Sequence, residues 1–279
     1  MWTQIVGKTR LALAPKENHW WHVALYVSAR GLTTTPIPHG TTVFEVAFDF
    51  VDHRLSVLTS DGKTRSIPLA SRSVADFYRE YMAALADLGL AVHFRPVPDE
   101  VEHPIPFAED RQHASYDAQQ ANRFWRVLLQ ADRILKRFRG RFVGKSSPVH
   151  FFWGSFDLAL TRFSGRRAPA RPGTNRLMQE ATSHEEISVG FWPGSGAVPL
   201  PAFYVYAAPE PAGFAATPVR PPAEYRREIS NFILPYDSVR ISATPDDTVL
   251  EFFQGTYAAA ADLAGWDRAT LERPEREWP

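Results

Sequence analysis

Residues 150–162 combine side chains that are unusual for a single strand, because tryptophan, serine and aspartate alternate with large apolar residues. Strand alternation would place Trp153, Ser155 and Asp157 on one face. Burying a carboxylate without a partner is costly, so we expect Asp157 to face water, to pair with a cation or to line a pocket. The alternative is a polar network that supports the fold.

The same segment offers groups for an enzymatic version of the site. The carboxylate of Asp157 would orient a histidine that acts as general base, either His150 or His184. The guanidinium of Arg162 would hold an anionic group of the substrate. Gly154 has no side chain and leaves room for the close approach of a backbone or a ligand.

A second cluster lies in the run His19-Trp20-Trp21-His22. On a strand, His19 and Trp21 would share one face, and Trp20 and His22 the other. These rings offer flat contact area with polar tips, which suits the stacking of an organic ligand. The alternative is an edge strand whose aromatic rings pack on a helix. We predict that His19, Trp21 and His22 contribute to a ligand pocket.

A third cluster is His184-Glu185-Glu186, followed on the same predicted strand by Trp192. A histidine beside carboxylates is more readily held in its charged form, which suits acid–base chemistry or metal binding. The alternative is the solvated start of a strand. We predict that Glu185 and Trp192 join the pocket.

A metal site would need several of these groups to converge. Its ligands would be Glu185 and the histidines His19, His22, His150 and His184, but no local ligand spacing supports such a site. We therefore predict no metal ligands and name no cofactor.

Composition narrows the classes of function. Lysine plus arginine number 31, as do aspartate plus glutamate, so the net charge favours neither nucleic acid nor an anionic lipid surface. The absence of cysteine excludes disulfides and thiolate chemistry and fits a reducing cytosol. No run approaches the ~20 apolar residues that span a bilayer. We expect a soluble, cytoplasmic protein with neither a nucleic-acid partner nor a membrane anchor.

An α+β fold, mostly antiparallel sheet with packed helices, would position these side chains. Alternation over 43–50 is typical of a half-buried strand, and Asp61-Gly62 indicates a hairpin turn between strands over 54–59 and 64–69. Ser73 and Asp117 are predicted to start helices, the first of which ends at Gly89. Further strands are expected over 20–28, 90–94, 149–163, 187–192 and 203–206, and a last helix over 247–263.

Residues 74–88 and 249–263 align without a gap, with valine, phenylalanine, three alanines, aspartate and leucine coinciding. This suggests two similar halves, each of three strands and a helix. The alternative is that alanine-rich amphipathic helices resemble one another. We predict one compact unit over 1–279, with halves 1–110 and 145–279 joined by a helix over 117–140. A site between such halves would suit a ligand.

Several motifs resemble a bacterial family known only as a domain of unknown function. They are Lys16-Glu17-Asn18-His19-Trp20-Trp21-His22, Ala29-Arg30-Gly31-Leu32-Thr33, His113-Ala114-Ser115-Tyr116-Asp117, residues 147–158 and Gly190-Phe191-Trp192-Pro193-Gly194. The resemblance covers nearly the whole chain. It implies a bacterial cytosolic protein of this size and brings no activity, cofactor or substrate.

We therefore predict a small-molecule-binding protein or an enzyme, with a pocket lined by the aromatic, histidine and acidic residues named above. The alternative is a non-catalytic interaction protein that buries its aromatic face against a partner or a second copy of the chain. Convergence of histidine, aspartate and tryptophan in a pocket would favour the first. A flat apolar patch would favour the second.

Overall fold

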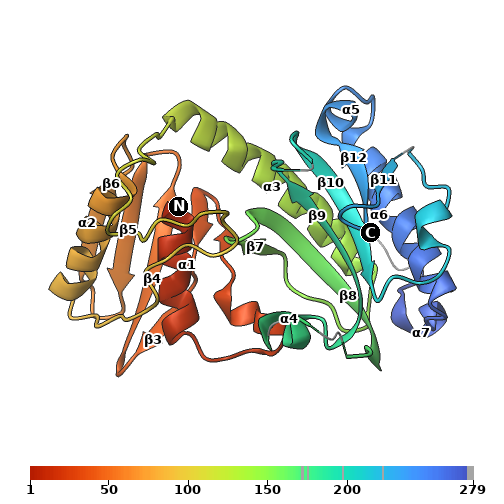
Figure 1. The fold of residues 1–279 in the computed structure, drawn as a ribbon, viewed down its shortest axis with the longest axis horizontal. Helices are drawn as coiled ribbons and strands as arrows, with labels where there is room; N and C mark the ends of the chain where they lie inside the picture. The colour runs from red at the N-terminus through yellow and green to blue at the C-terminus, as the bar shows by residue number, and fades with distance from the viewer. Residues whose placement is uncertain (171–172, 175, 197, 222, 275–279) are drawn as a thin grey trace. The chain divides into compact units, whose positions relative to one another are not determined.

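The computed structural model describes residues 1–170, 173–174, 176–196, 198–221 and 223–274. The chain divides into two compact units, the first made of Met1–Leu129 with Phe151–Phe156 and the second of Gln130–His150 with Asp157–Pro279 (Figure 1). Two six-stranded sheets are present, and the strand pairs described in them are antiparallel. The predicted α+β class is therefore confirmed.

The first unit is built on a meander of short strands. The sheet order is β1-β2-β4-β5-β6, with β3 paired to β4. Phe44, Val46 and Phe48 are buried in alternation, as predicted for this strand. The bounds are α1 (Trp2–Leu13), η1 (Asn18–Val23), β1 (Tyr26–Val27), β2 (Gly31–Thr33), β3 (Ile37–His39), β4 (Thr42–Asp49), β5 (Arg54–Thr59), β6 (Thr64–Pro68) and α2 (Val74–Asp87).

Helices α1 and α2 pack against each other in this unit. Trp2 stacks on Phe77 with ring centroids 4.5 Å apart, and the hydroxyls of Thr9 and Tyr81 are 2.9 Å apart. Ser73 caps α2 as predicted, accepting from the Asp76 N–H at 3.1 Å. The sequence patterns did not indicate α1, because this helix buries lysine, arginine and glutamine along with its apolar residues.

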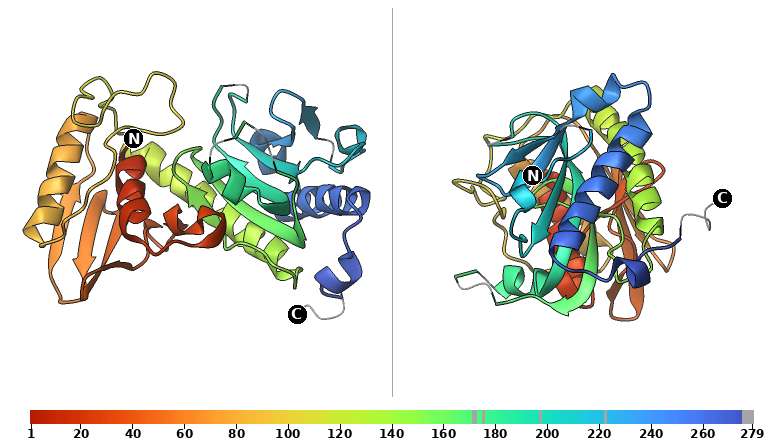
Figure 2. Two further views of the ribbon diagram at one scale, coloured as in Figure 1. Left: turned by 60° about the horizontal axis from the view of Figure 1, so that its bottom comes forward. Right: turned by 90° about the vertical axis from the view of Figure 1, so that its right-hand side faces the viewer.

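In the second unit, helix α6 (Pro245–Leu263) packs against strands β9 (His184–Trp192) and β10 (Ala202–Ala208) of the second sheet. The ring centroids of Phe203 on β10 and Phe253 on α6 are 5.9 Å apart, and those of Phe253 and Phe138 on α3 (Ala118–Gly140) are 5.7 Å apart. Figure 2 shows α6 running beside the second half of α3. The sheet order is β11-β12-β10-β9-β8-β7.

The remaining elements follow in chain order. Helix α3 passes from the first unit to the second at Gln130. The bounds are α3 (Ala118–Gly140), β7 (His150–Phe152), β8 (Asp157–Arg167), α4 (Arg176–Ala181), β9 (His184–Trp192), β10 (Ala202–Ala208), η2 (Phe214–Ala216), β11 (Glu224–Arg226), β12 (Asn231–Pro235), α5 (Tyr236–Arg240), α6 (Pro245–Leu263) and α7 (Arg268–Leu271).

Three strand predictions are wrong. Residues 20–28 form most of η1 and the short β1, because His19 and Trp20 adopt positive φ angles of 55° and 61°. The long strand over 149–163 is two strands, β7 and β8, separated by a turn in which Phe156 has φ 64°. Residues 90–94 bury Leu90 and Val92 without forming a strand.

The proposed duplication stays a prediction, as does the division of the chain into halves 1–110 and 145–279. The two aligned segments do form helices, α2 and α6, each packed in its own unit. Among the described residues, no helix has both the length and the apolar character needed to cross a bilayer.

Candidate functional site

The His19–His22 cluster sits in η1 and keeps the ring pairing expected of alternate residues. His19 and Trp21 have ring centroids 5.3 Å apart, and Trp20 and His22 5.4 Å. Consecutive left-handed residues with side chains are costly, so the surrounding structure must hold this conformation. Both histidines are buried, at 5% and 4% exposure.

Arg10 of α1 holds η1 in place. Its Nε donates to the His22 carbonyl at 2.6 Å, and its Nη1 donates to the Thr35 hydroxyl at 2.8 Å and to the Thr34 carbonyl. Burial lowers the pKa of Arg10. Burial also lowers the pKa of His22, whose Nδ1 accepts from the Glu17 N–H at 3.3 Å. His22 therefore belongs to the packing of this unit as a neutral ring.

Trp153 and its neighbours form the turn that follows β7. The Trp153 indole N–H donates to the Val23 carbonyl at 2.8 Å, and its ring covers Gly7, where a Cβ would lie 2.3 Å from the ring. The close approach predicted at Gly154 is made by the side chain of Glu100, whose Oε1 would be 2.5 Å from a Cβ there. Ser155 is exposed in the same turn.

Asp157 begins β8 in the second unit and is 8% exposed. The Tyr204 phenol on β10 donates to its Oδ2. Gly190 of β9 lies between the two strands, and a Cβ there would be 2.5 Å from the Tyr204 ring, so only glycine lets the ring pass. Burial and the Asp157 charge raise the pKa of Tyr204 well above its ordinary value.

Further hydroxyls extend this network along the same face of the sheet. Thr161 donates to Ser188 at 3.1 Å, and Ser188 in turn hydrogen-bonds to Tyr204. A described partner of Asp157 is thus the Tyr204 phenol, whereas we expected water, a cation or a pocket. This arrangement matches the alternative of a polar network that supports the fold.

Arg162 lies on the other face of β8 and is completely buried. Its guanidinium carbon is 3.4 Å from the Phe138 ring centroid and 4.3 Å from that of Tyr257. It donates to the Phe138 carbonyl near the end of α3. Burial lowers its pKa to about 9. Strand alternation places Arg162 and Asp157 on opposite faces of β8.

The predicted histidine bases differ in their surroundings. His150 is 1% exposed. His184 pairs with Arg167 across the sheet, and burial, Lys145 and Arg167 all lower its pKa. This lowering runs opposite to the effect expected of the neighbouring carboxylates. Trp192 ends β9 and is half-buried.

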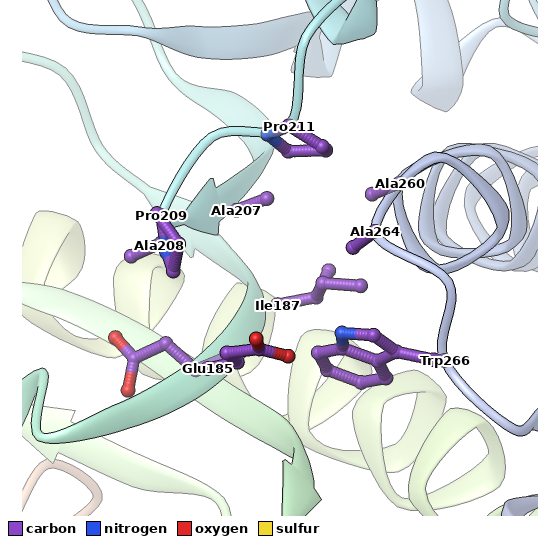
Figure 3. Close-up of a pocket in the computed structure, with 10 residues that line it drawn as sticks. Glu185, Ile187, Ala207, Ala208, Pro209, Pro211, Ala260, Ala264 and Trp266 are labelled. Carbon is purple, nitrogen blue, oxygen red and sulfur yellow. The ribbon is translucent and has the colours of Figure 1, made fainter. Parts of the chain in front are cut away.

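Glu185 is the predicted site residue that lines a cavity, which has a volume of about 190 Å³. Figure 3 shows the labelled side chains around it, with the indole nitrogen of Trp266 on the ring edge that faces Ile187. The walls come from β9, the end of β10, the loop after it and the end of α6. The lining residues are Glu185, Glu186, Ile187, Ala207, Ala208, Pro209, Pro211, Ala260, Ala264 and Trp266.

The end of α6 brings Trp266 to this cavity. Gly265 has φ 62° and its N–H donates to the Asp262 carbonyl at 3.1 Å, while the Trp266 N–H donates to the Ala261 carbonyl at 2.8 Å. These two bonds define a Schellman motif, in which a left-handed glycine reverses the chain. The side chain of Trp266 is therefore folded back against the helix, and its buried indole N–H has no hydrogen-bond partner among the described residues.

Two glutamates also line the cavity. Glu185 accepts from the Ser164 hydroxyl at 2.9 Å and from Arg166 Nε at 2.8 Å. Arg166 also donates to the Ala264 carbonyl at 2.6 Å, and so ties Glu185 to the end of α6. Glu186 is 5% exposed, and its charge opposes the lowering of the Lys145 pKa by burial.

Sequence reasoning missed Trp266 and the small residues of the lining. A signal was present at Gly265, since glycine directly after a helical pattern followed by a large apolar residue is typical of this helix stop. The alanines carried no signal, because alanine is common on any helix or strand. The described residues contain no cluster of three or more His, Asp or Glu side chains that would hold a metal.

The fold and the cavity define an α+β protein with two six-stranded antiparallel sheets and a small, partly acidic hollow in its second unit. Residues 1–273 match the family described as "Family of unknown function (DUF5996)", and the chain belongs to that family. Neither a curated protein nor a solved structure matches the chain.

Proposed function

We propose that this protein binds a small organic molecule in the cavity between β9, β10 and α6. The observation that carries the proposal is the lining, in which two glutamates and an indole N–H with no partner in the described part of the chain interrupt a wall of alanine, proline and isoleucine. Ligand sites have this composition, mostly apolar with a few polar groups that orient the ligand. A buried donor without a partner costs roughly 1–3 kcal/mol, and a bound acceptor would offset that cost.

The volume limits the size of the ligand. Sites for drug-sized molecules measure about 300–1,000 Å³, whereas a cavity of about 150 Å³ holds benzene. A cavity of about 190 Å³ therefore suits a ligand little larger than a substituted benzene ring, or the end of a longer molecule. The proposal places the protein in the cytosol, consistent with its lack of cysteine.

The indole N–H signal of Trp266 reports on the cavity directly. The chain has eight tryptophans, and Trp266→Phe assigns the signal by its disappearance from an ¹⁵N correlation spectrum. We expect benzylamine or benzyl alcohol at millimolar concentration to shift this signal and to raise the melting temperature, because a ligand that binds the folded state stabilises it.

A pair of matched variants locates the binding. Ala264→Leu places a larger side chain in the lining and should abolish the shift, whereas Ala259→Leu, on the same helix but outside the described lining, should preserve it. If no compound of this size moves the Trp266 signal, the proposal fails, and the alternative of a non-catalytic interaction protein gains support.

A further inference from the structure

We infer that the ligand of this cavity is a neutral molecule with a hydrogen-bond acceptor, such as an aryl ketone, that accepts from the Trp266 indole N–H; the inference rests on the proposed function. Trp266 is 7% exposed, and its indole N–H has no hydrogen-bond partner in the described part of the chain. In the described lining it is also the one side chain with an N–H or O–H to donate, because the others are apolar or glutamate.

The donor is held in place before any ligand binds. Gly265 turns the chain at the end of α6, and the Trp266 ring lies edge-to-face against Tyr257, with ring centroids 6.1 Å apart. In Figure 3 the indole nitrogen lies on the ring edge that faces Ile187, another residue of the lining. A donor fixed in this way loses little conformational entropy on binding, so the bound acceptor keeps most of the benefit of the hydrogen bond.

The ionised groups at the end of α6 are already paired, which favours a ligand without charge. Glu185 accepts from Arg166 Nε at 2.8 Å and lies 2.7 Å from its Nη2. The same guanidinium donates to the carbonyls of Ala264 and Gly265 at 2.6 and 3.1 Å. Neither an ammonium nor a carboxylate would find an unpaired opposite charge on this side of the described lining, so its burial would be costly.

The second glutamate of the lining, Glu186, belongs to the other face of the sheet. Phe191 shares the strand phase of Ile187, and its ring contacts Phe203, which packs on Phe253 of α6. Ile187 therefore lies on the face that α6 covers, and strand alternation directs the Glu186 side chain away from that helix. Trp266 and Glu186 thus do not form one polar group for a ligand.

The remaining wall suits the carbon part of an aryl carbonyl compound. Alanine, proline and isoleucine make up this wall, and the volume of about 190 Å³ admits a substituted benzene ring. A ketone or aldehyde accepts a hydrogen bond and brings no donor of its own. An alcohol or a primary amide also brings an N–H or O–H, which must find a separate acceptor or remain unpaired at a cost.

Two probes of the same shape test the hydrogen bond. Acetophenone carries a carbonyl oxygen where α-methylstyrene carries a methylene group, and equilibrium dialysis measures the Kd of each. We expect Trp266→Phe to weaken acetophenone binding by roughly threefold to tenfold more than α-methylstyrene binding, the factor for one net hydrogen bond. Trp20→Phe is the matched control, since the Trp20 indole N–H also lacks a partner among the described residues but lies in the first unit. It should change neither affinity.

The unaltered protein gives a second measurement, which decides the matter should circular dichroism show that Trp266→Phe does not fold. Acetophenone should move the indole proton signal of Trp266 downfield, as a new hydrogen bond does, and α-methylstyrene should not. Benzoate and benzylamine should bind at least about tenfold more weakly than acetophenone, because each would bury a charge without a partner.

Three results would overturn the acceptor inference while the proposed function survives. They are equal losses of both affinities in Trp266→Phe, no downfield movement with bound acetophenone, and tighter binding of benzoate or benzylamine than of acetophenone. If none of the four compounds binds, the proposed function fails as well.

Discussion

At the scale of single residues, two ionisable side chains of β8 that were predicted to be functional each contact other side chains of the second unit. Asp157 accepts from the Tyr204 phenol across Gly190, and Arg162 stacks on aromatic rings on the opposite face. Burying a charge is costly unless hydrogen bonds or ring faces compensate it. These partners are therefore part of what makes the second unit stable.

Replacing Tyr204 by phenylalanine tests the Asp157 network. The change removes a charge-assisted hydrogen bond to a buried carboxylate, so we expect Tyr204→Phe to lower the free energy of unfolding by about 2 kcal/mol. Urea unfolding followed by circular dichroism measures this loss. The double variant with Asp157→Asn should lose less than the sum of the two single changes, because both remove the same bond.

Tyr236 provides a matched control in the same unit. It is half-buried at the start of α5, and Tyr236→Phe should change the free energy of unfolding by no more than about 0.5 kcal/mol. Equal losses for Tyr204→Phe and Tyr236→Phe would show that the Asp157 bond contributes nothing specific.

At the scale of elements, the end of α6 decides whether the cavity exists. Gly265 reverses the chain in a left-handed conformation, and the Trp266 side chain follows from that reversal. A glycine in the same helix, Gly255, has no positive φ, and the nearest atom to a Cβ there would be Arg220 O at 3.9 Å. The same substitution by alanine should therefore change the stability of the protein in opposite directions at the two glycines.

We expect Gly265→Ala to destabilise the protein by about 1 kcal/mol and Gly255→Ala to stabilise it by up to about 1 kcal/mol. The melting temperatures of the two variants, compared with that of the unaltered protein, show whether each change destabilises or stabilises the fold. Gly265→Ala should also move the Trp266 indole N–H signal in the absence of any ligand, whereas Gly255→Ala should not. Stabilisation by Gly265→Ala would contradict the left-handed helix stop.

At the scale of the whole molecule, each unit contains a histidine whose pKa is lowered, the buried His22 in the first and the half-buried His184 in the second. Such a histidine binds its proton less readily when folded than when unfolded. Below the unfolded value of about 6.5, the unfolded chain therefore gains more protons, and stability falls as the pH falls. Above that value both states are neutral and this contribution is constant.

Acid unfolding measures this effect. Between about pH 7.5 and about pH 5.5 we expect the free energy of unfolding to decrease, each histidine contributing at most about 1.4 kcal/mol per pH unit. His22→Asn should flatten the decrease, and the control His103→Asn, in which a side chain 93% exposed is replaced, should leave it unchanged. A decrease of the same steepness in His22→Asn would show that His22 protonates without opposing the fold.

Local patterns predicted much of the fold. The alternation of Phe44, Val46 and Phe48, the Asp61-Gly62 turn and the Ser73 cap each depend on neighbours within a few residues, and all three are confirmed. Two of the three wrong strand predictions lie where the backbone departs from regular geometry, at His19, Trp20 and Phe156. A positive φ at a residue with a large side chain is imposed by distant contacts, such as those of Arg10 with η1. No local sequence pattern predicts it.

The sequence by itself determined the α+β class, the absence of thiol chemistry and the positions of the best-patterned helices and strands, because these depend on composition and short-range periodicity. Tertiary structure alone decided the partner of Asp157 and the place of Arg162 on the opposite face. It also decided that Glu185, Ala207 and Trp266 line one hollow. These residues are far apart in the chain, and only strand order and the helix stop at Gly265 bring them together.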